Sequence, residues 1–250
     1  MLVITADDYG KSQHATDNIL KCFINDRITS ASAMVFMRDS ERSASSASDI
    51  GLEIGLHVNF TLPFTAPYTP PKLREHQNRL VSYLTKHRLS QIFFNPWLTD
   101  AFSFVYLSQK EEFLRLYSKY PDYYNGHHHM HLCANMLVGN QLPKGARVRG
   151  TFTFERGEKG AFNRVYRQIL NFYISKRFIS TNAFFSIEPI QDHERLKNII
   201  KRAAKEDVEI EAHPENEEET GYLLSNQFQA LIKSVQIGPF LRLPSKGPWE

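Results

Sequence analysis

The sequence predicts an α/β fold in which parallel strands form a closed or nearly closed barrel, similar to a TIM barrel, with helices outside it. Short β-like runs alternate with helical stretches along the whole chain, as in folds with a mostly parallel sheet. The length of 250 residues is normal for one such barrel. No internal repeat or change of composition marks a boundary, so we expect a single domain over residues 1–250.

The first half of the chain supplies three expected strands. They cover residues 2–5 ("LVIT"), 28–36 and 52–61. Residues 16–27 show the apolar spacing of a helix, and the polar residues 38–48 are typical of a surface helix. The segment "LPFTAPYTPP" that follows the third strand is rich in proline, so we expect a loop there.

The second half continues the same alternation. Residues 72–120 indicate helix with breaks, one of them at "NPW", and residues 192–206 indicate another helix. The expected strands are residues 123–132, 146–154, 183–187, 208–214 and 237–243. A total of about seven or eight strands suits a closed or nearly closed barrel.

Composition excludes several functional classes. The formal net charge is +3 and the basic residues are scattered, so we expect no nucleic-acid partner. No apolar stretch reaches the ~20 residues needed to span a bilayer. The first residues are typical of a buried strand, not of a secretory signal. The two cysteines, Cys22 and Cys133, are expected to be reduced thiols. We therefore expect a cytoplasmic protein without a membrane partner.

Candidate functional residues fall at the ends of expected strands, which is where barrel enzymes carry their active sites. Asp7 and Asp8 end the first strand, His57 ends the third, and His213 ends a late one. Two adjacent carboxylates after a buried apolar strand are costly to desolvate unless something neutralises them, and a divalent cation does so. Each residue also has a structural interpretation: a turn for the aspartates, a core histidine for His57, and extended backbone before proline for His213.

A second group of histidines occupies the expected strand 123–132. His127, His129 and His131 would share one face of an extended strand, whereas His128 would point to the other. Burying three imidazoles there would discard apolar burial of ~1.5–3 kcal/mol per side chain. This face therefore indicates a function at the mouth of the barrel.

One aspartate with two histidines suits Zn²⁺, Ni²⁺, Co²⁺ or Mn²⁺, with Mg²⁺ less natural. Three protein ligands leave positions open for water and substrate. A second carboxylate could take a proton from the water, and a histidine could protonate the leaving group. This set of groups fits hydrolysis of an amide or ester.

Four motifs together resemble the YdjC-like carbohydrate deacetylase family, which includes chitooligosaccharide deacetylases. They are "TADDYG" at 5–10, "GLHVNFT" at 55–61, "NGHHHMHL" at 125–132 and "EAHP" at 211–214. The resemblance implies a distorted (β/α) barrel, often dimeric, that removes acetyl groups from N-acetylated sugars with the help of a metal. The expected partner is a small-molecule or oligosaccharide substrate, with a homodimer as a further expectation.

The resemblance also implies roles for individual residues. It implies one divalent metal ion (Zn, Mg, Mn, Ni or Co), with His129 left open as an alternative third ligand to His127. The implied roles are base for Asp7, acid for His213, metal ligands for Asp8, His57 and His127, and substrate binding for His129, His131 and Asn125.

The sequence departs from the family pattern at three places. Asn125 stands where the family usually has aspartate, and no Arg-Glu pair follows Tyr222. The arginine-containing strand is also looser, so that Arg147 or Arg149 could reach the substrate. Alternative functions are hydrolysis of another carbohydrate ester or a sugar-phosphate, or an inactive barrel that binds glycan or metal. Retention of Asp7, Asp8 and His213 disfavours the inactive barrel.

Overall fold

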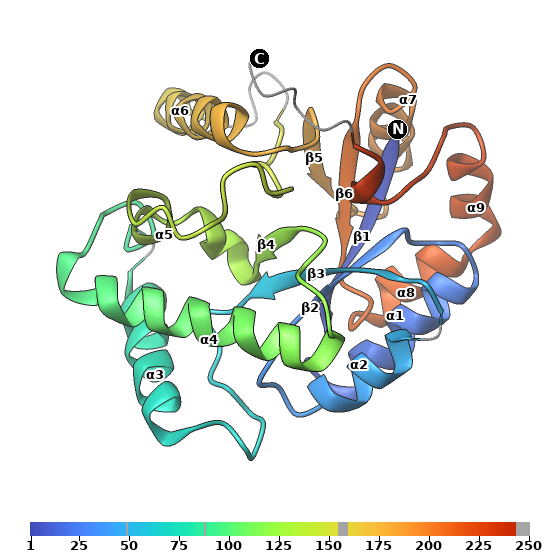
Figure 1. The fold of residues 1–250 in the computed structure, drawn as a ribbon. Coiled ribbons are helices and arrows are strands. Elements are labelled where there is room, and N and C mark those ends of the chain that lie inside the picture. Colours follow the sequence, from blue (N-terminus) through green and yellow to red (C-terminus); the bar gives the residue numbers. More distant parts are fainter. Residues whose placement is uncertain (49, 88, 155–159, 244–250) are drawn as a thin grey trace.

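The computed structural model describes residues 1–48, 50–87, 89–154 and 160–243. Six parallel strands form one curled sheet in the order β4-β3-β2-β1-β6-β5 (Figure 1). This half-barrel confirms the predicted distorted (β/α) barrel. The strands are β1 (Leu2–Tyr9), β2 (Ser30–Ala33), β3 (Glu53–Val58), β4 (Tyr124–Gly126), β5 (Ala183–Ser186) and β6 (Val208–Ala212).

Residues 146–154, expected as a strand, lie between the two edge strands β4 and β5. The Arg149 amide donates to the Tyr124 carbonyl at 3.0 Å, and the Thr153 amide donates to the Phe184 carbonyl at 2.8 Å. The segment makes only isolated bridges, such as Tyr124 with Val148. The barrel is therefore completed here by irregular backbone, and the described residues contain six regular strands instead of the expected seven or eight.

The helices lie outside the sheet (Figure 1). In the first of them the Ser12 side chain accepts a hydrogen bond from the Ala15 amide and so caps the helix. Ala15, Ile19 and Cys22 of that helix are buried at the spacing of one helix face. The helices are α1 (Gln13–Ile24), α2 (Ser40–Ser48), α3 (Pro71–Lys86), α4 (Thr99–Tyr117), α5 (Ala134–Val138), α6 (Ala161–Arg177), α7 (His193–Arg202), α8 (Glu217–Leu224) and α9 (Asn226–Ile232), with 3₁₀ turns η1 (Pro96–Leu98), η2 (His127–Leu132) and η3 (Phe240–Arg242).

The interior of the barrel is layered. At the amino-terminal ends of the strands, Val3 and Tyr123 pack with Phe240, whose ring stacks on Tyr123 at 4.4 Å. The expected strand 237–243 is wrong: its last residues form η3, which closes this end of the barrel. The Glu53 carboxylate holds η3 by accepting from the Phe240 and Leu241 amides at 2.7 Å each. This end of the barrel is therefore filled by apolar side chains, and the polar side chains lie at the opposite, carboxyl-terminal end.

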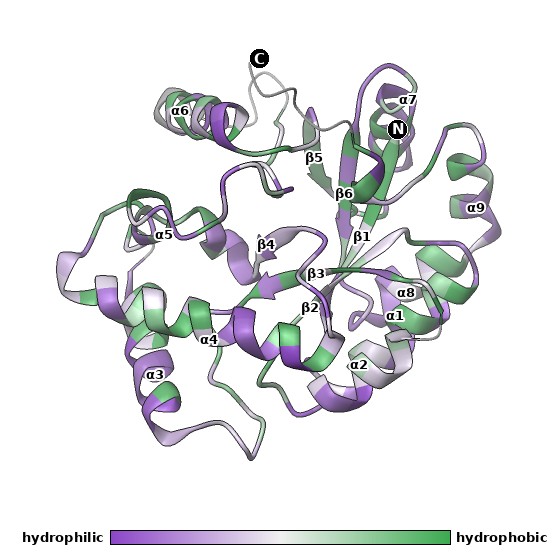
Figure 2. Cartoon of the chain, viewed as in Figure 1, coloured by the Kyte–Doolittle hydropathy of each residue, from purple (hydrophilic) through white to green (hydrophobic). Residues whose placement is uncertain are grey.

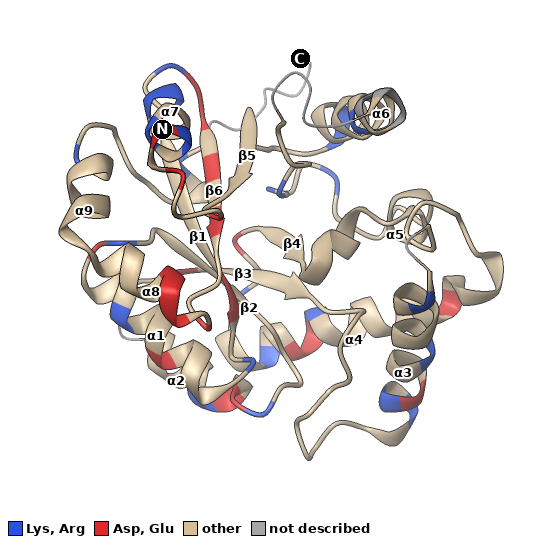
Figure 3. Cartoon of the chain, turned by 180° about the vertical axis from the view of Figure 1, so that it is seen from behind, with Lys and Arg blue, Asp and Glu red and all other residues tan. Residues whose placement is uncertain are grey.

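Alternation along the strands separates the apolar and charged residues. On β6, Val208 and Ile210 belong to the main hydrophobic core, whereas Glu209 and Glu211 alternate with them along the strand. Figure 2 shows the mixed hydropathy along this strand. In Figure 3 acidic positions follow β6 and the start of α8, whereas Lys and Arg lie mainly on the outer helices. Buried carboxylates of this kind require a buried counter-charge.

The expected strand over 123–132 is wrong beyond Gly126. β4 ends there, and η2 follows with left-handed backbone at His128 (φ 52) and His129 (φ 59). A Cβ atom on residue 126 would lie 2.9 Å from the backbone nitrogen of His131, which is too close. Only glycine therefore allows the chain to turn back so tightly here. The alternation of faces expected for the four histidines therefore does not occur.

Candidate active site

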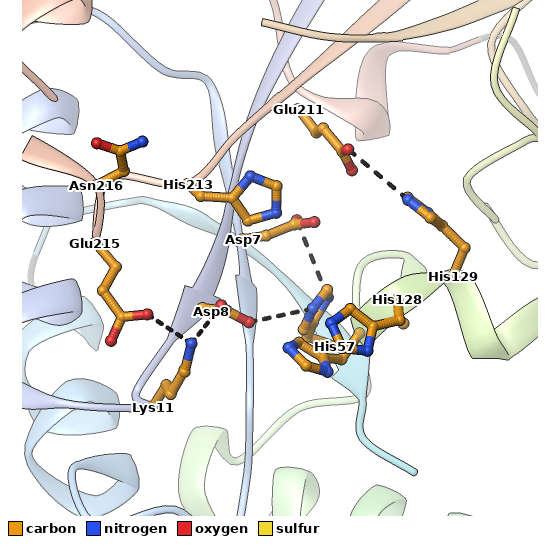
Figure 4. A pocket seen from close by; sticks show the side chains of 12 residues that line it. Asp7, Asp8, Lys11, His57, His128, His129, Glu211, His213, Glu215 and Asn216 are labelled. Atoms are coloured by element: carbon orange, nitrogen blue, oxygen red, sulfur yellow. Dashed lines mark hydrogen bonds and ion pairs between the residues drawn. The ribbon is translucent and has the colours of Figure 1, made fainter. Parts of the chain in front are cut away.

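A cavity of about 680 Å³ opens at the carboxyl-terminal ends of β1, β3, β4 and β6 (Figure 4). Active sites of barrel enzymes occupy this end of the sheet. The lining residues are mostly charged or imidazole-bearing, and they come from four separate parts of the chain. They are Asp7, Asp8, Lys11, His57, Gly126, His127, His128, His129, Glu211, His213, Glu215 and Asn216.

A bulge at the end of β1 brings both aspartates to the cavity. Side chains of neighbouring strand residues normally point to opposite faces. Here the pairing of β1 with β2 shifts between Ala6 and Tyr9, and Asp8 has left-handed backbone (φ 70). Bulges near active sites re-aim side chains in this way. The strained backbone at Asp8 is the local cost of presenting two adjacent carboxylates on one side.

Asn125 determines which nitrogen of His57 carries hydrogen. The Asn125 amide nitrogen donates to Asp7 Oδ1 at 3.1 Å and to Ser32 Oγ at 2.7 Å, which fixes the orientation of the amide. Asn125 Oδ1 then accepts from His57 Nδ1 at 2.8 Å. His57 Nε2 therefore points elsewhere, and it faces Asp8 Oδ1 at 3.4 Å.

The contact between His57 Nε2 and Asp8 Oδ1 is stabilised only if a positive charge lies between or on the two groups. Asp8 Oδ1 is buried and has no hydrogen-bond partner, and 3.4 Å is long for a hydrogen bond. Burial alone would raise the pKa of Asp8, but the neighbouring His57 lowers it below its ordinary range. Burial alone would lower the pKa of His57, but Asp7 and Asp8 raise it. A proton on His57 or a metal ion would satisfy the pair.

His127 lies beside this pair, with its ring edge-on to His57 at 5.9 Å between centroids. Its Nδ1 lies 2.6 Å from Thr61 Oγ1, and a hydroxyl that accepts from Nδ1 leaves Nε2 with a lone pair. Burial lowers the pKa of His127 to about 3, so the imidazole is neutral at pH 7. The three predicted ligands Asp8, His57 and His127 therefore all line the cavity as neighbours.

Arg149 clamps Asp7 from beneath the cavity. Its Nη1 lies 2.5 Å from Asp7 Oδ2, and its Nη2 lies 3.0 Å from Asp7 Oδ1. Burial alone would raise the pKa of Asp7, but the Arg149 guanidinium holds it well below its ordinary range. Arg149 is fully buried and makes its polar contacts beneath the cavity, which places it away from the substrate role considered for it.

Arg149 also contacts two further carboxylates. Its Nε donates to Glu209 at 2.7 Å, and Nη1 donates to Glu211 at 3.0 Å. Burial raises the pKa of Glu211 well above its ordinary value, against the opposing effect of Arg149. Sequence analysis missed this network, although "VEIEA" places two glutamates on one face of a strand and so signals a buried cation.

His213 follows β6 and lies half-exposed at the rim. Its backbone amide donates to Glu219 Oε2 at 2.6 Å. Ligand atoms of Asp7, Glu211 and His213 all lie within 4.8 Å of one another, which makes them a second group that could hold a metal ion. Because Arg149 already neutralises Asp7 and Glu211, a cation there would meet its positive charge.

The three residues expected to bind substrate lie in different places. His129 lines the cavity, with Nε2 3.8 Å from Glu211 Oε1. His131 is fully buried and its Nε2 donates to the Arg149 carbonyl at 3.1 Å. Asn125 is also fully buried, where it holds His57 and Asp7. The positions of His131 and Asn125 therefore suit support of the site, not contact with substrate.

Sequence analysis did not identify several residues of the cavity wall. His128, expected to point away, lines the cavity because of the turn after Gly126. Lys11 lies 3.0 Å from Asp8 Oδ2 and 2.5 Å from Glu215 Oε2. The "DDYGK" sequence contains that lysine, but only the fold brings Glu215 to it.

A curled parallel half-barrel with carboxylates and imidazoles at its carboxyl-terminal rim has the arrangement of a barrel enzyme. The chain belongs to the YdjC-like protein family, whose sequence profile matches residues 1–234. This family is related to carbohydrate deacetylases and hydrolases.

Among solved structures, the chain is similar to a protein from Enterococcus faecalis V583 proposed to cleave cellobiose-phosphate. The TM-score is 0.64 at 15% sequence identity, and the alignment covers 96% of this chain and 97% of the other. At this identity the likeness supports the fold alone. A search among curated proteins gives no significant match. Within the described residues, the helices are too short or too polar to cross a bilayer.

Proposed function

We propose that the protein is a metal-dependent hydrolase that removes acetyl groups from N-acetylated sugars or oligosaccharides. The observation that carries the proposal is the buried, unpartnered Asp8 Oδ1 facing His57 Nε2. Its setting in a cavity at the carboxyl-terminal rim, in a family related to carbohydrate deacetylases, supports the choice of reaction.

The residues at this point fit a divalent cation. Asp8, His57 and His127 offer one carboxylate and two imidazoles, a set that suits Zn²⁺, Mn²⁺, Co²⁺ or Ni²⁺ and less naturally Mg²⁺. The hydrogen bond from His57 to Asn125 leaves Nε2 for the ion. When bound, such an ion acidifies water and polarises the carbonyl of an amide. The alternative group of Asp7, Glu211 and His213, whose ligand atoms lie within 4.8 Å of one another, fits less well because Arg149 pairs with both of its carboxylates, whereas Lys11 pairs with Asp8 through Oδ2 and leaves Oδ1 without a partner.

We assign the role of general base to Asp7. The Arg149 guanidinium holds the pKa of Asp7 well below its ordinary range, so the carboxylate is ionised at neutral pH and has lone pairs that can accept a proton. Arg149 and Asn125 also fix both of its oxygens in position. A base held in one orientation loses little entropy at the reaction step.

We assign the role of general acid to His213. It lies close to Asp7 at the rim of the cavity (Figure 4). Its ring is half-exposed at the rim, and the Glu219 carboxylate holds its backbone amide. An amine leaves poorly without a proton, so His213 would deliver one to the nitrogen as the bond to the acetyl carbon breaks.

Acetate release tests the proposal. N-acetylglucosamine and chitobiose are incubated with protein that has been stripped by chelator and then supplied with Zn²⁺, Mg²⁺, Mn²⁺, Ni²⁺ or Co²⁺. We expect acetate only in samples that contain a metal. Release from an O-acetyl sugar or cleavage of a sugar-phosphate instead would support another hydrolase. Sugar binding without turnover would support a binding protein.

The remaining expectations are proposals of the same kind. The partner would be a small sugar or oligosaccharide, without nucleic acid or membrane. We also propose that the protein forms a homodimer and is located in the cytoplasm.

A further inference from the structure

Glu211 lines the cavity but has no part in the reaction described so far. Its Oε2 accepts from Arg149 Nη1 at 3.0 Å. Its Oε1 lies 3.8 Å from His129 Nε2, which is longer than a hydrogen bond. In Figure 4 the carboxyl group lies across the cavity from Asp8 and His57. One oxygen is thus anchored, and the other is left for a group inside the cavity.

The neighbours of the Glu211 carboxyl group limit what it can contact. A carboxyl oxygen of Glu211 lies within 4.8 Å of ligand atoms of Asp7 and His213. In the proposed function these two side chains handle protons at the scissile amide. A substituent of the sugar close to the amide would therefore lie nearest to the Glu211 carboxyl group.

We propose that Glu211 recognises the hydroxyl group adjacent to the acetamido group of the sugar, through its cavity-facing oxygen, and so selects the substrate. This inference rests on the proposed function. A hydroxyl both donates and accepts hydrogen bonds, so it suits the carboxyl group in either protonation state. His129, whose Nδ1 is buried without a partner, flanks the same position.

Glu209 provides a matched control within the same strand. It lies on the same face of β6, two residues earlier, and it also binds Arg149, at 2.7 Å. Unlike Glu211, it is fully buried and does not line the cavity. A substitution there disturbs Arg149 in a similar way without removing a group that could contact substrate.

The test compares N-acetylglucosamine with its 3-deoxy and 1-deoxy analogues in metal-loaded wild type, E211M, E211Q and E209M. We expect wild type to prefer the parent sugar over one analogue by about 10- to 100-fold in kcat/KM, the range for one hydrogen bond to a charged or buried group. E211M should reduce that ratio to near one, whereas E211Q should retain part of it. E209M should keep the ratio even if it slows every substrate.

Preservation of the ratio in E211M would overturn the inference, as would its equal loss in E209M. Calorimetric titration of the same three sugars separates this inference from the proposed function, because binding does not require turnover. If wild type releases no acetate, the proposed function fails. Equal binding of parent and deoxy sugars by wild type would then overturn the role of Glu211, whereas a preference lost only in E211M would support it. Circular dichroism of E211M and E211Q checks folding.

Discussion

Replacement of Arg149 by methionine gives a strong test of how the charged interior is balanced. Arg149 is fully buried and makes ion pairs with Asp7, Glu209 and Glu211 at 2.5, 2.7 and 3.0 Å. Methionine keeps much of the side-chain length but removes the positive charge. Removing one partner of a buried ion pair costs about 3–5 kcal/mol. At about 2–4 °C per kcal/mol for a chain of this size, the melting temperature should fall by about 6–20 °C.

The loss of stability in R149M should also depend on pH, and the pKa of Asp7 determines whether it grows or shrinks as pH rises. In wild type the pKa of Asp7 is held below its unfolded value, about 3.9, so this residue stabilises the fold above that pH and stops doing so as pH falls. Without Arg149, burial would raise the pKa above the unfolded value. The folded variant would then hold a proton that the unfolded chain releases, and its stability would fall as pH rises, by up to about 1.4 kcal/mol per pH unit per proton.

Urea unfolding of chelator-treated protein between pH 4.5 and pH 7.5 measures both effects. Arg147→Met is the matched control, because the Arg147 guanidinium contacts the Leu241 carbonyl at 3.3 Å and no ion pair to a carboxylate is found for it among the described residues. We expect the difference in free energy of unfolding between wild type and R149M to increase as pH rises. The free energy of unfolding of R147M should stay close to that of wild type throughout. A gap that is constant or narrows with rising pH would refute the assigned charge balance.

Four further predictions concern the metal and the reaction. Asp8→Ala should abolish stoichiometric metal uptake, measured by plasma emission after dialysis, and a wild-type protein that binds no divalent cation would contradict the proposal. His127→Ala should lose the metal whereas His129→Ala keeps it; the opposite result would make His129 the third ligand. Asp7→Asn should keep the metal yet lose about 10²–10⁴-fold in activity on amides and esters, the usual contribution of a general base. His213→Ala should slow amide hydrolysis while sparing an aryl acetate, whose phenolate leaves without a proton; equal slowing of both would exclude a role as acid.

The sequence by itself determined the class of fold and the end of the barrel that carries the site. Apolar periodicity and turn residues act over a few positions, so the strands that begin at Leu2 and Glu53 and the helices between strands could be predicted from local patterns. Polar residues directly after those strands, such as Asp7 and His57, could then be assigned to one rim.

Only the tertiary structure decided how the side chains at that rim are aimed and balanced. The bulge at Asp8 arises from the pairing of β1 with β2, and the turn at His128 arises because His131 packs over Gly126. Arg149 reaches Asp7 across 142 positions of the chain. Such contacts join segments that are distant in sequence, and a buried charge gains its partner only when those segments are folded together. Local sequence spacing does not show which distant residue becomes the partner of a buried charge. It could therefore identify the reactive residues but not the residues that hold them in position.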